Sequence, residues 1–328
     1  AWFKAGIKDA EEGTSTQSDL YPDYEIPISI LDWPAHGDPA LGQDFYLAPF
    51  YDRNEDGLYN PQDGDYPWYD IEKELDCTSD RTVTLYGDQT VWWIMNDKGN
   101  IHTETGGDPI GMEIRAQAFA FSDNTEINNM TFYNYVLINQ GSQTLTNTYF
   151  GQWVDSDLGR PDDDYVGCDV QRGLGYAYNG DDNDEVNGGA SPGYGETPPA
   201  LGVDFFEGPF QDSDGIDNPG PYKLGTAEFG VPEGQMNYNV AKSGNGIPYS
   251  GLGIGYGDSI PDNERFGMRK FLYYNIGNGD INDPATADHY YNYLNGVWKD
   301  NQPFIYGGNA HDENTGADPS QLCDYMFP

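Results

Sequence analysis

The stretch from Asp52 to Pro67, DRNEDGLYNPQDGDYP, constrains the fold of this chain more than any other. It opens with the spacing D-x-N-x-D-G, in which oxygen-bearing side chains alternate along the chain and Gly57 permits a sharp turn. This spacing is typical of a calcium-binding loop, because Ca²⁺ takes about 6–8 oxygen ligands in flexible geometry. The expected ligands are the side chains of Asp52, Asn54, Asp56, Asn60 and Asp63 and the backbone carbonyl of Leu58.

The loop departs from an EF-hand at its end. Asp63 stands where a bidentate Glu is usual, and Pro61 and GDYP follow where an amphipathic helix would be needed. We therefore expect a free-standing calcium loop on a β-rich scaffold. The alternative is a cluster of acidic turns without a metal, although so many unneutralised carboxylates would repel one another.

Two further acidic clusters are candidate cation sites. The second cluster, DSDLGRPDDD, directly follows a predicted strand, and the third, QDSDGIDNP, has Gly215 at its turn. The expected ligands are Asp155, Asp157, Asp162 and Asp164 in the second cluster and Asp212, Asp214 and Asp217 in the third. The competing interpretation is a run of Asx turns, in which Asp and Asn side chains accept hydrogen bonds from nearby backbone amides and need no ion.

The composition indicates a folded, turn-rich chain. A formal net charge of −40 over 328 residues would favour disorder, yet 15% of the residues are aromatic, which disordered chains lack. The 42 glycines and 22 prolines require many turns. We expect an all-β fold, an antiparallel β-sandwich with long calcium-bound loops and one short helix in the C-terminal region.

Residue patterns place the expected elements. Strands are predicted at residues 82–86, 89–95, 112–122, 130–139 and 148–155. These segments are rich in β-branched and aromatic residues, or their side chains alternate in character with the period of two residues that a strand shows. The last three of these predict an antiparallel meander. Apolar spacing after Pro284 predicts a helix over residues 284–298, and a short helix is expected over residues 8–12.

The chain is expected to divide into three parts. These are an irregular N-terminal segment with the calcium loop at 1–81, a β-sandwich core at 82–178 and a loop-rich extension at 179–328, with 179–218 a long loop. No apolar run approaches the roughly 18 residues that a membrane span needs. The chain begins at Ala1 without a signal peptide, so we expect a mature piece or a segment of a longer protein.

Charge and motif content exclude several functions. The 55 acidic residues against 15 basic ones argue against nucleic acid as a partner. Cys77, Cys168 and Cys323 have no CxxC spacing and leave the disulfide pairing open, and the four histidines lack paired spacing, so a zinc hydrolase is disfavoured. We expect no catalytic residues. Exposed aromatic side chains could instead form a sugar-stacking platform, although the tryptophans on strands are expected in the core.

Several runs carry a resemblance to a known family. WPAHGDP, LAPFYDRNEDGLYNPQDGDYP, GDQTVWWIMNDKGNIHTETGGDPIGMEI and GQWVDSDLG resemble large secreted, surface-exposed proteins of Bacteroidota that leave the cell by the type IX secretion system. The resemblance is dense from about residue 33 to 220 and looser beyond. It implies an exported protein whose sorting domain would follow Pro328 and whose sequence continues on both sides of this segment. It implies location rather than enzymatic activity.

These observations lead to one expected function and one alternative. We expect a calcium-stabilised segment of a secreted, extracellular or cell-surface protein with a structural, adhesion or assembly role. Its expected partners are other copies, cell-surface or secretion components, and glycans. The alternative is a secreted carbohydrate-binding module or polysaccharide hydrolase that uses exposed aromatics and a carboxylate pair.

Overall fold

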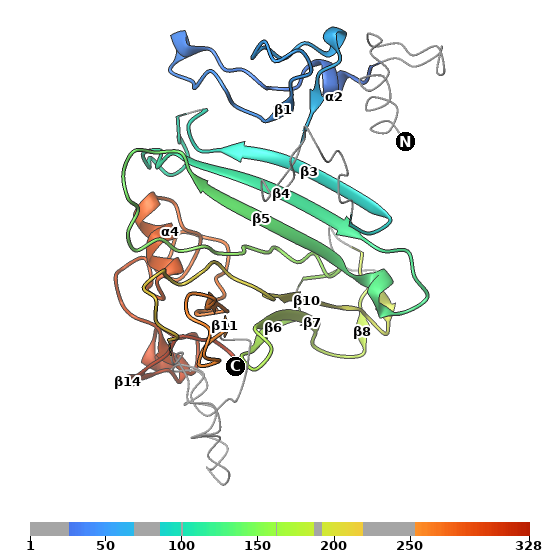
Figure 1. Cartoon of the computed structure of the whole chain (residues 1–328). Helices are drawn as coiled ribbons and strands as arrows, with labels where there is room; N and C mark the ends of the chain where they lie inside the picture. Colours follow the sequence, from blue (N-terminus) through green and yellow to red (C-terminus); the bar gives the residue numbers. More distant parts are fainter. Residues whose placement is uncertain (1–25, 69–85, 100, 162, 187–191, 219–252) are drawn as a thin grey trace. The chain divides into compact units, whose positions relative to one another are not determined.

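A computed structural model describes residues 26–68, 86–99, 101–161, 163–186, 192–218 and 253–328 (Figure 1). The chain divides into two compact units, Ala1–Leu145 and Thr146–Pro328, here called unit 1 and unit 2. Their strands form several small antiparallel sheets, and the described helices are few and short. The all-β character expected from the sequence is therefore confirmed. The short helix expected at 8–12, most of the strand expected at 82–86, and Cys77 lie outside the described residues.

The main sheet of unit 1 is a three-stranded antiparallel meander. Its order is β3 (Gln89–Asn96), β4 (Met112–Ala120) and β5 (Thr131–Asn139), the long arrows of Figure 1. Strands were expected at these three places, and each begins and ends within a residue or two of the predicted bounds. The carboxylate of Asp97 connects β3 to β4, because it accepts hydrogen bonds from the backbone N–H groups of Ile110 (2.5 Å) and Met112 (2.9 Å).

The central strand β4 buries polar side chains on one face. Glu113, Arg115 and Gln117 are all buried, and Glu113 and Arg115 form an ion pair of 2.7 Å. Ala116, on the opposite face, is also buried. Alternation along a strand places residues 113, 115 and 117 on one side, so this face carries a buried polar row.

The rest of unit 1 is built from short elements. They are α2 (Ile28–Leu31), η1 (Pro39–Leu41), β1 (Phe50–Tyr51), η2 (Pro61–Asp63), β2 (Tyr66–Pro67) and η3 (Glu126–Asn129). Strands β1 and β2 pair antiparallel, and the rings of Tyr51 and Tyr66 stack with centroids 4.9 Å apart. Trp68 is buried directly after β2. The aromatic contacts give the acidic stretch between β1 and β2 a packed base.

Unit 2 contains a second three-stranded antiparallel sheet and three strand pairs. The sheet has the order β10 (Ala200–Asp204), β7 (Leu174–Asn179), β6 (Asp164–Asp169). The pairs are β8 (Asn183–Asp184) with β9 (Gly195–Glu196), β11 (Gly253–Ile254) with β12 (Arg265–Phe266), and β13 (Ile305–Tyr306) with β14 (Asp318–Leu322), and η5 covers Glu313–Thr315. The expectation of a long loop over residues 179–218 was therefore wrong, because β8, β9 and β10 lie within it.

A buried aromatic cluster forms the core of unit 2. Trp298 and Phe304 are fully buried and pack with Tyr293, Cys323 and Met326 among others. The indole N–H of Trp298 donates a hydrogen bond of 2.9 Å to a backbone carbonyl in this core. Burial of this aromatic group contributes hydrophobic stabilisation to the described part of unit 2.

Helix α4 (Ala287–Leu294) confirms the helix expected in the C-terminal region, in a shorter form than predicted. The hydroxyl of Thr286 caps it by accepting a hydrogen bond from the backbone N–H of His289. The helix ends at Leu294 with Asn295 as its C-cap, and Gly296 follows with a φ of +74°, a left-handed conformation that glycine adopts without strain.

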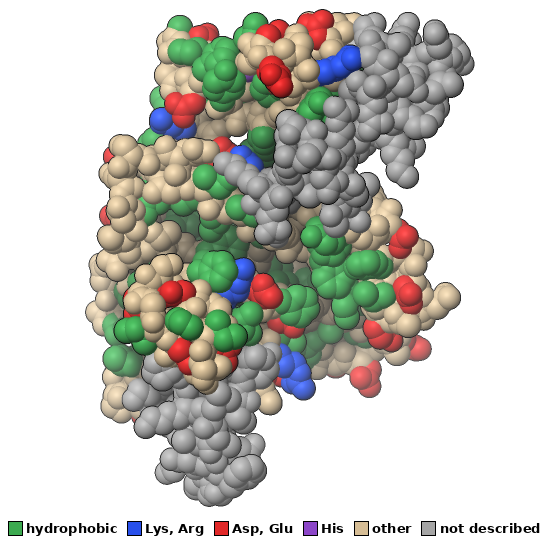
Figure 2. Space-filling view, viewed as in Figure 1, with side chains coloured by type: hydrophobic (Ala, Val, Ile, Leu, Met, Phe, Trp, Pro, Cys, Tyr) green, Lys and Arg blue, Asp and Glu red, His purple; other side chains and the backbone are tan. Residues whose placement is uncertain are grey.

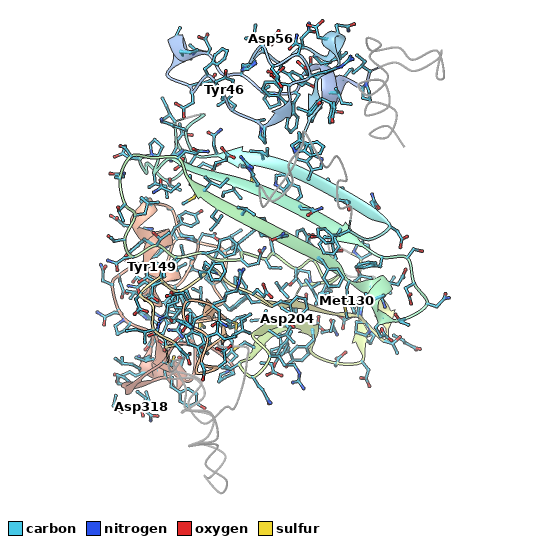
Figure 3. The ribbon with its side chains drawn as sticks, in the orientation of Figure 1. Tyr46, Asp56, Met130, Tyr149, Asp204 and Asp318 are labelled. Carbon is cyan, nitrogen blue, oxygen red and sulfur yellow. The ribbon has the colours of Figure 1, made fainter. Side chains whose placement is uncertain are left out.

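The strand expected at residues 148–155 is not formed, so the predicted meander was wrong in its third strand. Side chains rather than a backbone ladder hold this segment. The hydroxyl of Tyr149, which Figure 3 labels, donates to Asn295 Oδ1 at 3.0 Å. The indole N–H of Trp153 donates to the hydroxyl of Tyr274 at 2.5 Å. The third strand of the meander is β3 instead.

Candidate metal centres

The first acidic loop, residues 52–65, is organised by its own backbone amides. Asp52 accepts hydrogen bonds from the backbone N–H groups of Asp56 (3.3 Å) and Gly57 (2.6 Å), and Asp56 accepts one from Leu58 (2.8 Å; Figure 3). Asn54 Oδ1 also accepts from the N–H of Asp56, at 3.2 Å. The Asn54–Asp56 and Asp56–Leu58 contacts span two residues and are Asx turns, the arrangement that the competing interpretation describes. They coil the chain so that the alternating side chains at 52, 54 and 56 face the same short turn.

The buried carboxylate of this loop is Asp65. Only 3% of Asp65 is exposed, and its oxygens accept hydrogen bonds from the backbone N–H groups of Arg53 (2.9 Å) and Asn60 (2.8 Å). Burial raises the pKa of Asp65, and the negative charges of Asp52 and Asp56 raise it further against the lowering effect of those hydrogen bonds. Asp65 therefore lies within electrostatic reach of two predicted ligands.

Asp63 occupies a different environment from Asp65. It is exposed, and its Oδ2 accepts a hydrogen bond of 2.5 Å from Asn60 Nδ2. Counting by EF-hand spacing selected Asp63, whereas Asp65 is the carboxylate turned into the loop. The sequence signal for Asp65 was its place directly before the aromatic residue Tyr66, which is buried and anchors the loop.

The base of the first acidic loop is fixed by contacts outside it. The backbone N–H of Tyr59 donates to His36 Nε2 at 2.8 Å, and the Tyr59 hydroxyl donates to the carbonyl of Ile30 at 2.6 Å. Together with the β1–β2 pair, these contacts hold both ends of the loop and its middle. A cation binding here would therefore meet a positioned set of oxygens.

The structure describes three of the four predicted ligands of the second cluster. Asp155 and Asp157 are exposed, and Asp162 lies outside the described residues. Asp164, the first residue of β6, lies beside Asp163 and Asp184. Burial raises the pKa of Asp164, and the negative charges of these two neighbours add to the effect.

Two residues that the sequence did not indicate belong with Asp164. Asn179 is the cross-strand partner of Asp164, and its Nδ2 donates to Asp163 Oδ2 at 3.3 Å. Asp184 is fully buried, and its two oxygens accept hydrogen bonds from the backbone N–H groups of Arg160 (3.0 Å) and Tyr194 (2.7 Å). A side chain on Gly159 would collide with the Asp184 carboxylate, so glycine is required for this approach.

The third cluster bonds to a distant segment of unit 2. Asp217 accepts hydrogen bonds from the backbone N–H groups of Gly257 and Ser259, both at 2.6 Å. Asp214 accepts from the N–H of Ile216 at 2.8 Å, and Asp212 accepts from Asn218 Nδ2 at 3.3 Å. These aspartates therefore hold the backbone in place through hydrogen bonds. The backbone N–H of Ser259 takes part in this role through its bond to Asp217.

A buried glutamate accompanies the third cluster. Glu264 is 1% exposed, and its Oε1 accepts a hydrogen bond of 2.5 Å from the backbone N–H of Asn218. Its Oε2 has no hydrogen-bond donor among the described residues. Glu264 is far from the cluster in sequence, so spacing alone could not have found it.

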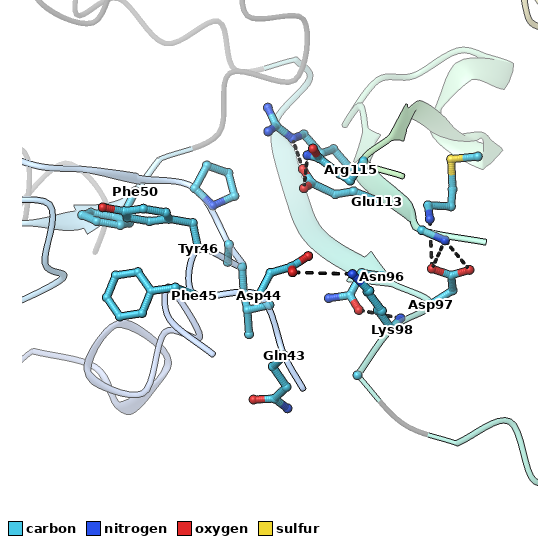
Figure 4. Close-up of a pocket in the computed structure, with 17 residues that line it drawn as sticks. Gln43, Asp44, Phe45, Tyr46, Phe50, Asn96, Asp97, Lys98, Glu113 and Arg115 are labelled. Carbon is cyan, nitrogen blue, oxygen red and sulfur yellow. Dashed lines mark hydrogen bonds and ion pairs between the residues drawn. The ribbon is translucent and has the colours of Figure 1, made fainter. Parts of the chain in front are cut away.

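A pocket of about 560 Å³ lies in unit 1, between residues 43–50 and the adjoining ends of β3 and β4 (Figure 4). Phe45 and Tyr46 are exposed beside it. Asp44 Oδ1 and Lys98 Nζ form an ion pair of 3.5 Å. The buried ion pair on β4 also lines it, and Gln140 Nε2 donates to Glu113 Oε2 at 2.9 Å. The pocket thus combines aromatic rings with hydrogen-bonding side chains.

The tryptophans have different environments. Trp298, which lies outside the predicted strands, is in the core of unit 2, whereas Trp153, which was expected in the core as part of a strand, is 64% exposed. Trp92 and Trp93 on β3 are half-buried, and Trp92 packs edge-on against Trp33 with ring centroids 4.8 Å apart. In the described residues, therefore, strand tryptophans do not form a continuous exposed platform.

Carboxylates alone do not make a metal site here. Among the residues that the structure describes, no group of three His, Cys, Asp or Glu side chains could hold a metal ion. A cation in any of these clusters would need amide or backbone carbonyl oxygens as well, which are ligands that Ca²⁺ accepts. Cys168 and Cys323 are buried free thiols, and burial raises the pKa of each to about 12.

Acidic side chains are spread over the visible face in Figure 2 rather than gathered in one patch. No helix within the described ranges is long and apolar enough to cross a membrane. Comparison of the chain with models of protein families, with curated proteins and with solved structures finds no match.

Proposed function

We propose that this chain is a calcium-stabilised segment of a secreted cell-surface protein with a structural, adhesion or assembly role. The observation that carries the proposal is the first acidic loop, where buried Asp65 lies within electrostatic reach of Asp52 and Asp56. Carboxylates this close repel one another unless a cation neutralises them. The Asn54 and Asn60 side chains and the loop carbonyls would complete an oxygen-only ligand set, which Ca²⁺ prefers.

Calcium would offset the repulsion within this acidic chain. An ion that binds only the native state stabilises it by RT ln(1 + [L]/Kd), or roughly 2.7 kcal/mol at a hundredfold excess over Kd. Calcium modules with Kd values of about 10⁻⁴–10⁻³ M suit extracellular conditions. The net charge of −40 also supports an extracellular setting with calcium, because without bound cations the compact state brings like charges close together.

Export and assembly form the second part of the proposal. The resemblance to type IX secretion cargo of Bacteroidota supports a place outside the cell. Other copies of the chain, or cell-surface and secretion components, are the proposed partners. We also propose the finer fold expected from the sequence, a β-sandwich with calcium-bound loops, and the antiparallel pairing of strands within each unit supports its all-β part.

Chelation tests the calcium proposal directly. Excess chelator should lower the melting temperature by about 5–10 °C, from roughly 2.7 kcal/mol at about 2–4 °C per kcal/mol for a chain of this size. The double variant Asp52→Asn with Asp56→Asn should reproduce part of this loss in calcium. The matched control is Glu104→Gln with Asp108→Asn, which removes the same charge from exposed positions. Identical melting curves with and without chelator would contradict the proposal.

A second candidate function rests on the pocket of unit 1. Phe45 and Tyr46 could stack on a sugar ring while the polar groups of Asp44, Lys98 and Gln140 bind its hydroxyls. This is the carbohydrate-binding alternative, with polysaccharide hydrolysis as its enzymatic form. Glycan-array binding that Tyr46→Ala abolishes and Tyr149→Ala leaves intact would favour it. Absence of binding across neutral and acidic polysaccharides would remove it.

A further inference from the structure

Three buried side-chain oxygens lie at the end of the β6–β7 pair without a hydrogen-bond donor among the described residues. They are Asp163 Oδ1, Asp164 Oδ1 and Asn179 Oδ1. Buried polar atoms in native proteins nearly always have a partner, so three such oxygens in one place require an explanation. Each is an acceptor, which means that the missing partner is a donor or a cation.

The three residues are neighbours in space. Asp164 and Asn179 are directly opposite in the antiparallel register, so their side chains lie on the same face of the pair. Asp163 accepts a hydrogen bond from Asn179 Nδ2 at 3.3 Å, and its backbone carbonyl accepts one from the N–H of Gly180 at 2.9 Å. Asp163 and Asp164 therefore both lie beside Asn179 at one corner of the sheet.

The orientation of the Asn179 amide is fixed by its contacts. Its Nδ2 donates to Asp163 Oδ2 and to the backbone carbonyl of Asp181 at 3.1 Å. Both partners are acceptors, so exchanging the nitrogen and oxygen would place two acceptors against an acceptor. The Oδ1 atom is therefore on the opposite side of the amide, and only 8% of Asn179 is exposed. This is a buried acceptor that is held in place and lacks a donor.

A water molecule would satisfy this corner incompletely. Water donates two hydrogen bonds, whereas three oxygens need a partner, two of them on carboxylates. A cation can accept lone pairs from more than two oxygens, and it also neutralises charge. The fully buried carboxylate of Asp184 lies near Asp164 but is occupied by two backbone N–H groups, so it adds negative charge without needing to be a ligand.

We propose that Asp163, Asp164 and Asn179 bind a calcium ion through these three oxygens, with backbone carbonyls and water completing the coordination. Oxygen-only ligands of this kind select a hard cation, and a flexible, partly hydrated site favours Ca²⁺ over Mg²⁺. The inference extends the proposed function to a second site in unit 2, and it replaces exposed Asp155 and Asp157 with Asn179. Few charged ligands predict weak affinity, in the range of extracellular modules.

The test is calcium titration of the full chain by isothermal titration calorimetry with calcium chloride, after removal of metal. Asp164→Asn should remove one binding site from the stoichiometry, or weaken it at least tenfold. In chelator, the same variant should melt at a higher temperature than the parent, because the new amide can donate to Asp163 or Asn179 and one buried charge is gone. A residue with only a structural role would not produce this opposite response in calcium and in chelator.

Controls separate this site from the first acidic loop. Asp182→Asn removes a charge from an exposed residue nearby and should leave the stoichiometry unchanged. Asp163→Asn provides a second variant with the same expected loss, in case Asp164→Asn folds poorly by near-ultraviolet circular dichroism. If both variants keep the parent stoichiometry, this inference is overturned while the loop at residues 52–65 stands. If the parent itself binds no calcium, the proposed function fails with it.

Discussion

The backbone N–H of Asn60 donates a hydrogen bond of 2.8 Å to Oδ2 of Asp65, which closes the first acidic loop on a buried carboxylate. The other oxygen of Asp65 accepts from Arg53. Hydrogen bonds to a charged group contribute about 1.5–3 kcal/mol each. Asp65→Ala should therefore lower the free energy of unfolding by roughly 2–4 kcal/mol, measured by urea denaturation in calcium.

Glu55→Gln, at an exposed position in the same loop, is the control and should change the free energy of unfolding by less than about 0.5 kcal/mol. Equal effects of the two variants would show that Asp65 has no central role.

The pH dependence of stability follows from the same carboxylate. The pKa of Asp65 is raised above the ordinary value of 3.8, chiefly by burial. The folded state therefore favours the protonated acid, and this contribution is present below pH 3.8 and is lost as pH rises through the raised pKa. In chelator, the stability of the parent relative to Asp65→Asn should fall as pH rises from 4 towards 7. Calcium should reverse the trend, because it binds the ionised carboxylate. A pH-independent difference between the two proteins in chelator would contradict the assignment.

Trp298 should be the most sensitive core position of unit 2. It is fully buried, and its indole N–H donates to the carbonyl of Ala310. Trp298→Ala should cost about 3–5 kcal/mol through the cavity that it leaves. Trp298→Phe keeps most of the apolar contact and removes only the indole hydrogen bond to the Ala310 carbonyl, which still accepts one from the backbone N–H of Ile305, so it should cost less. Exposed Trp153→Phe is the comparison, and a melting-temperature loss as large as that of Trp298→Phe would argue against this packing.

The thiols of Cys168 and Cys323 should be inert in the native state. Burial raises the pKa of each to about 12, so at pH 8 almost none of the reactive thiolate is present, and the fraction increases only as pH approaches 12. In a Cys77→Ser background, a thiol reagent such as dithionitrobenzoate should react with neither residue until denaturant is added, and then with both. Rapid stoichiometric labelling of the folded protein at pH 8 would contradict the burial.

Asp97 should control the β3–β4 connection. Its carboxylate accepts backbone hydrogen bonds from Ile110, Gly111 and Met112. Asp97→Ala leaves these N–H groups without their acceptor and should cost about 1–3 kcal/mol. Hydrogen exchange should accelerate at the amides of residues 110–112 before it does so in β5. Replacement of exposed Asp108 by Ala is the matched control, and equal protection of residues 110–112 in both variants would reject this role.

Local sequence determined the elements whose signals are contained in a few neighbouring residues. Alternating side chains predicted β3, β4 and β5, because a pleated strand presents successive residues to opposite faces. Apolar spacing after Pro284 predicted a helix, and α4 forms within the predicted range, from Ala287 to Leu294. Dense acids with glycine and asparagine likewise predicted tight acidic loops, because Asp and Asn side chains can accept hydrogen bonds from amides two residues further along, as Asn54 and Asp56 do.

Tertiary structure decided which acids and amides meet. Residues 148–155 have the composition of a strand, but their side chains bond to Tyr274 and Asn295 and no ladder forms. Spacing selected Asp63, whereas folding turned Asp65 into the loop. Asn179 reaches Asp164 only through the β6–β7 register, and Glu264 reaches the third cluster across 46 residues of sequence separation from Asn218. The physical reason is that burial and electrostatic interaction depend on distance in space. A contact between residues far apart in the sequence produces no periodic residue pattern from which it could be predicted.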